Sequence, residues 1–289
     1  MNIAKSNTLQ VRSTIFSILL SILLLQATTY LAAQANYGDN KEAGHFLLSR
    51  GFNCYYELYG KGEPLVLIHN NGGSIKSFAG QIPYFAKQYK VIAVDSRAQG
   101  KSIDNKDSLT FEQMADDFND LLDSLHLDST YVIGWSDGGI TGLLLAMRHP
   151  EKVKKLAVSG PNLWPDTTGL IPYVYHYIEK HSEELSRQQQ TPVVKNRLKI
   201  YNLDLYEPHV TLDRLRSIKC PTLVIGGDHD AIPVQHLLDI AGYIPRSYLW
   251  IIPNSGHATP KFKTDIFNTV VGEFFTAPYR KIEGDAVFQ

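Results

Sequence analysis

The sequence predicts an α/β fold in which a mostly parallel, twisted sheet of about eight strands carries helices on both faces and a small helical cap. From about residue 44 onward, short and continuous apolar runs alternate with helical patterns. Apolar runs of this length are typical of strands that are covered on both faces. The chain of 289 residues, with 44% hydrophobic and 20% charged residues, is long enough to bury a sizeable core.

The first two strand signals, 45–48 and 53–59, are rich in aromatic residues and are joined near Gly51, which favours an antiparallel hairpin. Between the strand signals, the clearest helical pattern covers 110–125, where apolar side chains fall on one face after a capping signal at Thr110. The remaining apolar runs are predicted as buried strands, at residues 65–68, 91–94, 131–133, 156–158, 223–225 and 248–252.

One segment, 161–217, contains no strand signal and is rich in tyrosine, with prolines between helix-forming stretches. A strandless stretch of this length is an insertion rather than a loop, so we expect a helical cap over the sheet. Two ordinary crossover helices are the alternative interpretation. The predicted organisation is a signal peptide at 1–35, a core formed by 36–160 and 218–289, and the cap insertion at 161–217.

The N-terminal segment has the layout of a secretory signal. Lys5 and Arg12 precede an apolar run at 15–25, which is shorter than the ~20 residues that span a bilayer. Ala33 and Ala35 place small residues at the positions that a signal peptidase reads. We therefore predict cleavage after Ala35 and export to the periplasm or the medium, with an uncleaved N-terminal membrane anchor as the alternative.

Charge and cysteine content exclude several classes of protein. The 28 basic and 29 acidic side chains leave a formal charge of -1, which gives no basic surface for nucleic acid. Only Cys54 and Cys220 are present, so the chain is not a disulfide scaffold. We expect a small-molecule substrate, no nucleic-acid partner and no stable membrane span after signal cleavage.

The clearest chemical motif is Gly-Trp-Ser-Asp-Gly-Gly at residues 134–139, between the predicted strand 131–133 and a helical pattern at 140–147. A nucleophile on a sharp strand-to-helix turn needs small residues two positions before and after it. Gly134 and Gly138 meet this requirement around Ser136. A glycine-rich turn with a bystander serine is the alternative, and a turn centred on Asp137 is disfavoured because it would place Trp135 at a small-residue position.

With this motif, the chain from about residue 44 onward resembles the α/β-hydrolase fold family, whose triad runs in the order serine, acid, histidine. A glycine-containing segment follows the run 223–225 and matches the family's acid turn at Asp230, with Asp228 as the fallback. His257 follows the last predicted strand, where the family has its base. The resemblance implies a catalytic triad of Ser136, Asp230 and His257, and it implies neither a metal nor another cofactor.

The same resemblance implies an oxyanion hole made by the backbone amides of Asn71 and Asp137. The segment 69–74 follows the third predicted strand, with Asn70 where the family usually has glycine, and His69 is expected to support this loop. A second family motif lies at residues 95–102, with Ala98 in place of a glycine. Because the fold separates the opening hairpin from the seventh strand, we expect the two cysteines to remain free thiols.

The turn around Ser136 is especially similar to that of valacyclovir hydrolase, a biphenyl-hydrolase-like enzyme that cleaves amino-acid esters. That similarity implies that Asp137 binds a substrate ammonium, whereas an acidic residue that merely complements the helix dipole is the alternative. Trp135 and Trp164 are further candidate substrate contacts, and the aromatic cap favours small or medium carboxylic esters. Carbon-carbon bond hydrolases, enol-lactonases and cofactor-free haloperoxidases share the triad, and a non-enzymatic ligand-binding protein on this fold is a more distant alternative.

Overall fold

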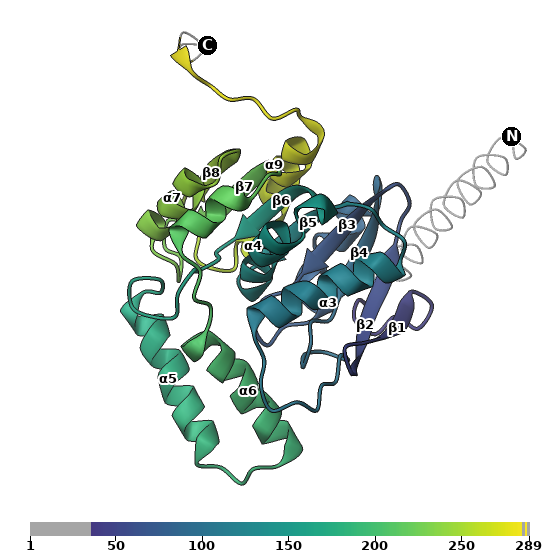
Figure 1. Ribbon diagram of the computed structural model, residues 1–289, viewed down its shortest axis with the longest axis vertical. Helices are drawn as coiled ribbons and strands as arrows, with labels where there is room; N and C mark the ends of the chain where they lie inside the picture. Colours follow the sequence, from purple (N-terminus) through teal and green to yellow (C-terminus); the bar gives the residue numbers. More distant parts are fainter. Residues whose placement is uncertain (1–35, 285–286, 288–289) are drawn as a thin grey trace, which may run out of the picture.

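The computed structural model describes residues 36–284 and 287 of the chain, and the predicted signal peptide at 1–35 lies outside these residues. The predicted fold class is confirmed: one sheet has the strand order β1-β2-β4-β3-β5-β6-β7-β8 (Figure 1). β1 and β2 are antiparallel to their neighbours, and the pairs from β4 to β8 are parallel. The strands are β1 (Gly44–Ser49), β2 (Phe52–Tyr59), β3 (Glu63–Ile68), β4 (Tyr89–Val94), β5 (Thr130–Trp135), β6 (Val153–Ser159), β7 (Thr222–Gly227) and β8 (Ser247–Ile252).

The inner strands are apolar throughout because each of their faces packs against a separate cluster of buried residues. In β3, Val66 and Ile68 join one cluster, whereas Leu65 and Leu67 join the other. Side chains of α3, α4 and α7 complete the first cluster, and those of α2 and α9 complete the second. The helices are α2 (Ile82–Phe85), α3 (Phe111–Ser124), α4 (Asp137–Arg148), α5 (Pro172–Ser186), α6 (Pro192–Tyr206), α7 (Val234–Tyr243), α8 (Thr259–Phe262) and α9 (Thr264–Thr276). Across the described part of the chain, no helix has both the length and the apolar character needed to cross a bilayer.

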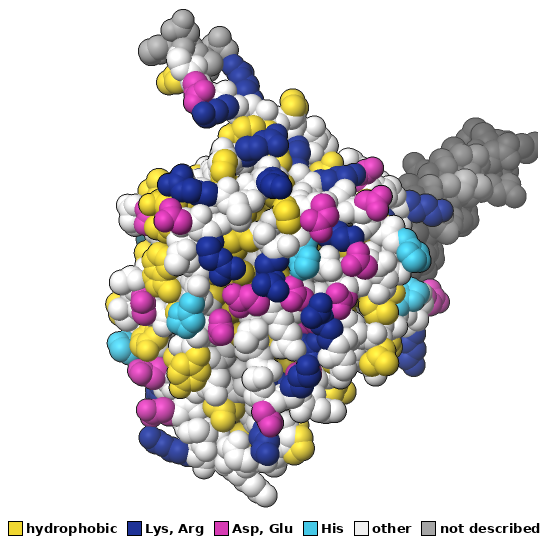
Figure 2. All heavy atoms as spheres, viewed as in Figure 1, with side chains coloured by type: hydrophobic (Ala, Val, Ile, Leu, Met, Phe, Trp, Pro, Cys, Tyr) yellow, Lys and Arg dark blue, Asp and Glu magenta, His cyan; other side chains and the backbone are white. Residues whose placement is uncertain are grey.

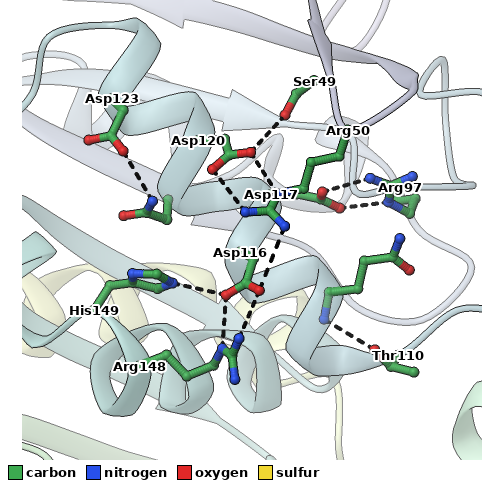
Figure 3. Close-up of polar contacts among 12 residues, drawn as sticks. Ser49, Arg50, Arg97, Thr110, Asp116, Asp117, Asp120, Asp123, Arg148 and His149 are labelled. Carbon is green, nitrogen blue, oxygen red and sulfur yellow. Dashed lines mark hydrogen bonds and ion pairs between the residues drawn. The ribbon is translucent and has the colours of Figure 1, made fainter.

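Helix α3 starts where the capping signal predicts, because the Thr110 side chain accepts a hydrogen bond from the amide of Gln113. Its acidic side chains tie it to neighbouring segments of the chain, and Asp117, for example, accepts two hydrogen bonds from Arg97 (Figure 3). Asp120 accepts two hydrogen bonds from Arg50 in the β1–β2 turn, and Asp116 accepts two from Arg148 at the end of α4. These contacts fix α3 over the sheet beside the helix that follows the predicted nucleophile.

The segment predicted as a cap contains α5 and α6, which lie side by side beyond one end of the sheet (Figure 1). Helix α6 is attached to the core by polar contacts: Lys199 Nζ donates to Asp104 Oδ2 at 3.0 Å, and Asn196 donates to the carbonyl oxygen of Ala98. Arg97 donates to the same Asp104 at 3.0 Å and to the buried Asp117 of α3 at 2.7 Å. Cap and core are therefore joined through α6 by a buried ion pair.

On the face shown in Figure 2, basic and acidic side chains are mixed, and no large patch of one charge sign is seen. This pattern agrees with the formal charge of -1. Cys54 and Cys220 are unpaired and buried, as the fold predicts, and burial raises the pKa of the Cys54 thiol to about 12. A thiol in that state is protonated at neutral pH, so it is a poor nucleophile.

Candidate active site

Ser136 lies on a sharp turn between β5 and α4, with φ 56° and ψ -119°. A non-glycine residue in this region of backbone space is strained and persists only where its surroundings enforce it. The two flanking glycines explain how the turn closes. A Cβ on Gly134 would lie 2.1 Å from the carbonyl oxygen of Gly138, and a Cβ on Gly138 would lie 1.8 Å from that of Ile68. Only glycine fits at either position, so the motif predicts this turn for a steric reason.

The structure brings the three predicted triad residues together from three loops at one edge of the sheet. His257 Nε2 lies 2.8 Å from Ser136 Oγ, and His257 Nδ1 lies 2.6 Å from Asp230 Oδ1. A carboxylate can only accept hydrogen bonds, so Nδ1 of the imidazole must donate to Asp230. In the neutral ring, Nε2 is then the acceptor that faces the serine hydroxyl. This is the geometry that a serine needs for activation by a general base.

Asp230 is held in place and kept ionised by several donors. Burial raises the pKa of this carboxyl, but hydrogen bonding and attraction to His257 and the amides of Gly227 and Ile232 bring it below its usual value. The neighbouring Asp228, the fallback acid, accepts instead from the amide of Ser255, at 3.0 Å. Asp228 therefore ties the loop after β7 to the loop that carries His257, whereas Asp230 contacts the imidazole.

The predicted oxyanion residues flank the serine. Asp137 is the first residue of α4, where a helix leaves its N–H groups without an intrahelical acceptor. Asn71 lies in the turn after β3, closed by a hydrogen bond from the amide of Gly73 to the carbonyl oxygen of Asn70. In this turn the positive φ occurs at Gly72, at 62°, and Asn70 does not adopt one. The Asn70 substitution for the family's glycine is thus accommodated without left-handed backbone.

His69 supports this turn, as the sequence predicts. The amide of Ser96 donates to His69 Nε2 at 3.0 Å, and His69 Nδ1 lies 2.8 Å from the carbonyl oxygen of Asn70. The first contact makes Nε2 an acceptor, so Nδ1 carries the proton and the ring is neutral. Burial lowers the pKa of His69 to about 4, which keeps the ring neutral well below pH 7.

The side chains of the two oxyanion residues also contact each other, and a residue of the cap joins them. Asn71 Nδ2 donates to Asp137 Oδ2 at 2.8 Å, and Asp204 of α6 is hydrogen-bonded to Asp137. Sequence reasoning did not identify Asp204. One feature of the sequence could have indicated it: Asp204 is an acidic residue between Leu203 and Leu205, in a helical segment that was predicted to cover the site.

The two tryptophans predicted as substrate contacts have partners within the protein. Trp135 is 6% exposed, and its indole N–H donates to the carbonyl oxygen of His257. Trp164 donates to Thr168 Oγ1 at 2.6 Å and helps to line an open surface groove of about 520 Å³ with residues 209–213. A substrate-binding role for either tryptophan remains a prediction.

The cap tyrosines divide into two groups by exposure. Tyr173 and Tyr206 are exposed, so they project into solvent rather than enclose a pocket. Tyr175 and Tyr201 are partly buried against the main apolar cluster. These two remain the tyrosines that could contribute aromatic surface beneath the cap.

A sheet of this topology with a glycine-flanked serine turn after β5 defines the class of α/β hydrolases. Residues 63–179 match the sequence profile described as the alpha/beta hydrolase fold, and this match supports membership of the α/β-hydrolase fold family. It is similar to Serine hydrolase BPHL of Mus musculus, with 25% identity over 256 residues that cover 78% of this chain and 83% of that protein. The Putative carbamate hydrolase RutD of Serratia proteamaculans (strain 568) is 29% identical over 258 residues, covering 75% of this chain and 94% of that protein.

Solved structures confirm the architecture. The enol-lactonase from Burkholderia xenovorans LB400 superposes with a TM-score of 0.68 at 21% identity, covering 81% of this chain and all of the other. This likeness shows the fold only. The names of the similar proteins, a serine hydrolase, a putative carbamate hydrolase and an enol-lactonase, indicate different substrates. The sequence profile and the similar hydrolases, rather than this superposition, support an enzyme of the hydrolase superfamily.

Proposed function

We propose that the protein hydrolyses small or medium carboxylic esters through an acyl-enzyme on Ser136. The observation that carries this proposal is the continuous line of contacts Ser136–His257–Asp230, with distances of 2.8 Å and 2.6 Å. Both distances lie within the hydrogen-bond reach required of a nucleophile, a base and an orienting acid.

In the proposed first step, His257 Nε2 accepts the Ser136 proton while Oγ attacks the ester carbonyl carbon. The carbonyl π electrons move to oxygen, and the amides of Asn71 and Asp137 stabilise the resulting oxyanion. His257 then returns its proton to the alkoxide oxygen as the alcohol leaves. Asp230 keeps the imidazole in the correct tautomer and stabilises its protonated form.

In the second step, a water molecule takes the place of the alcohol. His257 removes one proton from the water, the oxygen attacks the acyl carbon, and the collapse of the second tetrahedral intermediate returns the proton to Ser136 Oγ. The carboxylic acid leaves and the enzyme is restored. This mechanism uses only side chains and backbone amides of the chain and needs no metal or other cofactor.

The nature of the cleaved bond is the open part of the proposal. The relatives include proteins named putative carbamate hydrolase and 2-hydroxymuconate semialdehyde hydrolase, the latter 27% identical over 269 residues. A panel of nitrophenyl esters of increasing acyl length, an aminoacyl ester, a carbamate, a lactone and a ring-cleavage diketone separates these activities. We expect the largest kcat/KM for a short or medium neutral ester, and a larger value for the diketone would assign the chain to carbon-carbon bond hydrolysis instead.

The aminoacyl-ester alternative depends on Asp137. Its similarity in position to the ammonium-binding aspartate of a related enzyme supports this role, but the Asp137 carboxyl is 2% exposed and has Asn71 and Asp204 as partners. A substrate ammonium would have to replace one of these partners. An aminoacyl ester that is cleaved no faster than a neutral ester of equal size contradicts the ammonium role.

The catalytic assignment is tested by Ser136→Ala, together with Ser186→Ala as a control at an exposed serine of α5. We expect Ser136→Ala to lose activity by at least about 10⁴-fold with an unchanged melting temperature, and Ser186→Ala to keep full activity. A fluorophosphonate should add its mass to the wild type and the control but not to Ser136→Ala. Undiminished turnover or labelling in Ser136→Ala contradicts the proposal.

We also propose that the chain is exported and cleaved after Ala35. The basic residues, the apolar run and the small residues at Ala33 and Ala35 support this step. The intact mass of the protein recovered from the producing organism should correspond to a chain that begins at Asn36. A mass that retains residues upstream of the apolar run would favour the uncleaved anchor.

A further inference from the structure

The cap meets the nucleophile turn through a pair of carboxyl groups. Asp204, near the end of α6, is hydrogen-bonded to Asp137, the residue that follows the proposed nucleophile. Asn71 Nδ2 donates to Asp137 Oδ2 at 2.8 Å and to the carbonyl oxygen of Ile200 at 3.2 Å. Ile200 lies one turn before Asp204, so one face of the cap helix contacts both residues whose amides are proposed to bind the oxyanion.

A hydrogen bond between two carboxyl groups requires a proton on one of them. Burial raises the pKa of Asp137 to about 6, but the hydrogen bonds from Asp204 and Asn71 and the attraction to His257 favour its ionised form. Burial raises the pKa of Asp204, and the charge of Asp137 and the hydrogen bond to it raise it further. Asp204 therefore keeps the proton and donates, and Asp137 accepts.

We propose that Asp204 is a positioning residue of the hydrolase site: its protonated carboxyl, carried by the cap helix, donates to Asp137 and so holds Asp137 and Asn71 in place beside Ser136. This inference rests on the proposed function. The side-chain contacts run from α6 to Asp137 and from Asp137 to Asn71, and the amides of these two residues must point at one oxygen atom. A shift of about 1 Å in such a site costs about 10²-fold in rate.

The geometry distinguishes this role from recognition of a cationic substrate. Asp137 is buried, and its carboxylate already accepts from Asn71 and Asp204. A pair of carboxyl groups that shares one proton carries a single negative charge, and the proton occupies the contact that an ammonium would otherwise make. Removing the Asp204 proton donor should therefore alter kcat for neutral esters, whereas removal of an ammonium site would alter KM for cationic esters only.

The proposed role implies a specific pH dependence. The titratable side chains near the pair are His257, from the loop after β8, and Tyr201, which lies one turn before Asp204 in α6 and whose pKa is raised mainly by burial. The positioned state contains protonated Asp204, so kcat should fall on the alkaline side as Asp204 loses its proton. An asparagine at this position can donate to Asp137 and cannot ionise.

The test compares Asp204→Asn and Asp204→Leu with the wild type, and Glu184→Gln on α5 is a control at an exposed carboxyl of the cap. The measurements are kcat and KM for a neutral nitrophenyl ester from about pH 5 to about pH 10, with melting temperatures. We expect Asp204→Asn to keep kcat within about threefold and to lack the alkaline decline. Asp204→Leu should lower kcat about tenfold or more, with little change in KM, and the control should match the wild type.

Three outcomes overturn the inference: unchanged kcat in Asp204→Leu, an alkaline decline that persists in Asp204→Asn, or a change confined to KM for an aminoacyl ester. A second measurement does not depend on turnover. The infrared band of a protonated carboxyl group should be present in the wild type at neutral pH and missing from Asp204→Asn, and its absence from the wild type contradicts the proton assignment. If no substrate in the panel is cleaved and Ser136 resists fluorophosphonate, the proposed function fails, whereas the infrared result still decides the state of Asp204.

Discussion

The indole N–H of Trp135 donates a hydrogen bond to the carbonyl oxygen of His257 at 2.9 Å. The two residues are 122 positions apart in the chain. Trp135 immediately precedes the proposed nucleophile, and His257 is the proposed base. This contact fixes the backbone of the histidine loop relative to the serine turn. The distance between Ser136 and the imidazole thus depends on a side chain that points into the apolar cluster below the sheet.

We predict that Trp135→Phe lowers kcat for a neutral ester about tenfold and leaves KM within about twofold. Phenylalanine retains the apolar packing but removes a donor to a backbone carbonyl, which is worth about 1 kcal/mol. Trp250→Phe is the matched control, because Trp250 packs against the same apolar cluster from β8. Equal effects of the two substitutions on kcat would mean that packing, and not the hydrogen bond, explains the loss.

Much of the fold was predictable from local sequence. All eight strands overlap the ranges predicted for them. The inner strands do so because a strand that is buried on both faces requires an apolar run, whereas the exposed edge strand β1 was predicted from its hairpin signal. The serine turn was equally predictable, because the carbonyl oxygens near Gly134 and Gly138 exclude any side chain. In both cases a short segment of sequence is enough for the prediction, because burial of the strand or the steric crowding of the turn acts on neighbouring residues.

The contacts between distant segments were not predictable in this way. Asp204 and Asp137 are joined by a hydrogen bond, but nothing in the sequence around either residue indicates the other. The hydrogen bond that Asp228 accepts from the amide of Ser255 likewise depends on how two loops approach each other. Such pairs depend on the placement of the cap and of the loops, which is set by the packing of the whole molecule.

Gly160 provides a second test of the geometry around His257. It follows β6 with φ 61°, and a Cβ at this position would lie 2.8 Å from both Cε1 and Nδ1 of the imidazole. We predict that Gly160→Ala lowers kcat about 100-fold through displacement of the ring, and lowers stability by about 1 kcal/mol through backbone strain. Gly242→Ala in α7 has open space around its Cβ and should keep full activity. An active Gly160→Ala enzyme would show that the imidazole position tolerates this shift.

Two buried histidines should make the folded state sensitive to mild acid. Burial lowers the pKa values of His69 and His236 from 6.5 to about 4. The folded state therefore disfavours the protonated rings, and this part of the stability is complete above pH 6.5 and is lost as pH falls from 6.5 to about 4. The loss is on the order of 3 kcal/mol for each ring.

Urea unfolding at a series of pH values measures this dependence. We expect the free energy of unfolding of the wild type to fall across this window and that of His236→Gln to fall less steeply. His236 is the better choice for substitution because it lies away from the oxyanion turn and accepts a hydrogen bond from the amide of Leu163. Parallel curves for the wild type and the variant would contradict a neutral, buried His236.

The attachment of the cap to the core depends on Lys199. Its ammonium, buried beside the middle of α6, donates to Asp104 Oδ2 and to the carbonyl oxygen of Lys106 at 2.7 Å. We predict that Lys199→Met destabilises the protein by about 3 kcal/mol or more, because Arg97 is then left to neutralise two buried carboxylates, Asp104 and Asp117. Lys195→Met, at an exposed residue one turn earlier in the same helix, should change stability by less than about 0.5 kcal/mol.

The same substitution tests whether α6 acts on the chemistry. Since Lys199 and Asp204 lie on one helix that contacts the core at both points, loosening the first contact should weaken the second. Lys199→Met should therefore lower kcat at temperatures where the protein is still fully folded, and the Lys195→Met enzyme should not. A Lys199→Met enzyme with reduced stability but unchanged kcat would mean that the Asp204–Asp137 contact, and not the buried ion pair, is sufficient to hold the cap helix against the oxyanion turn.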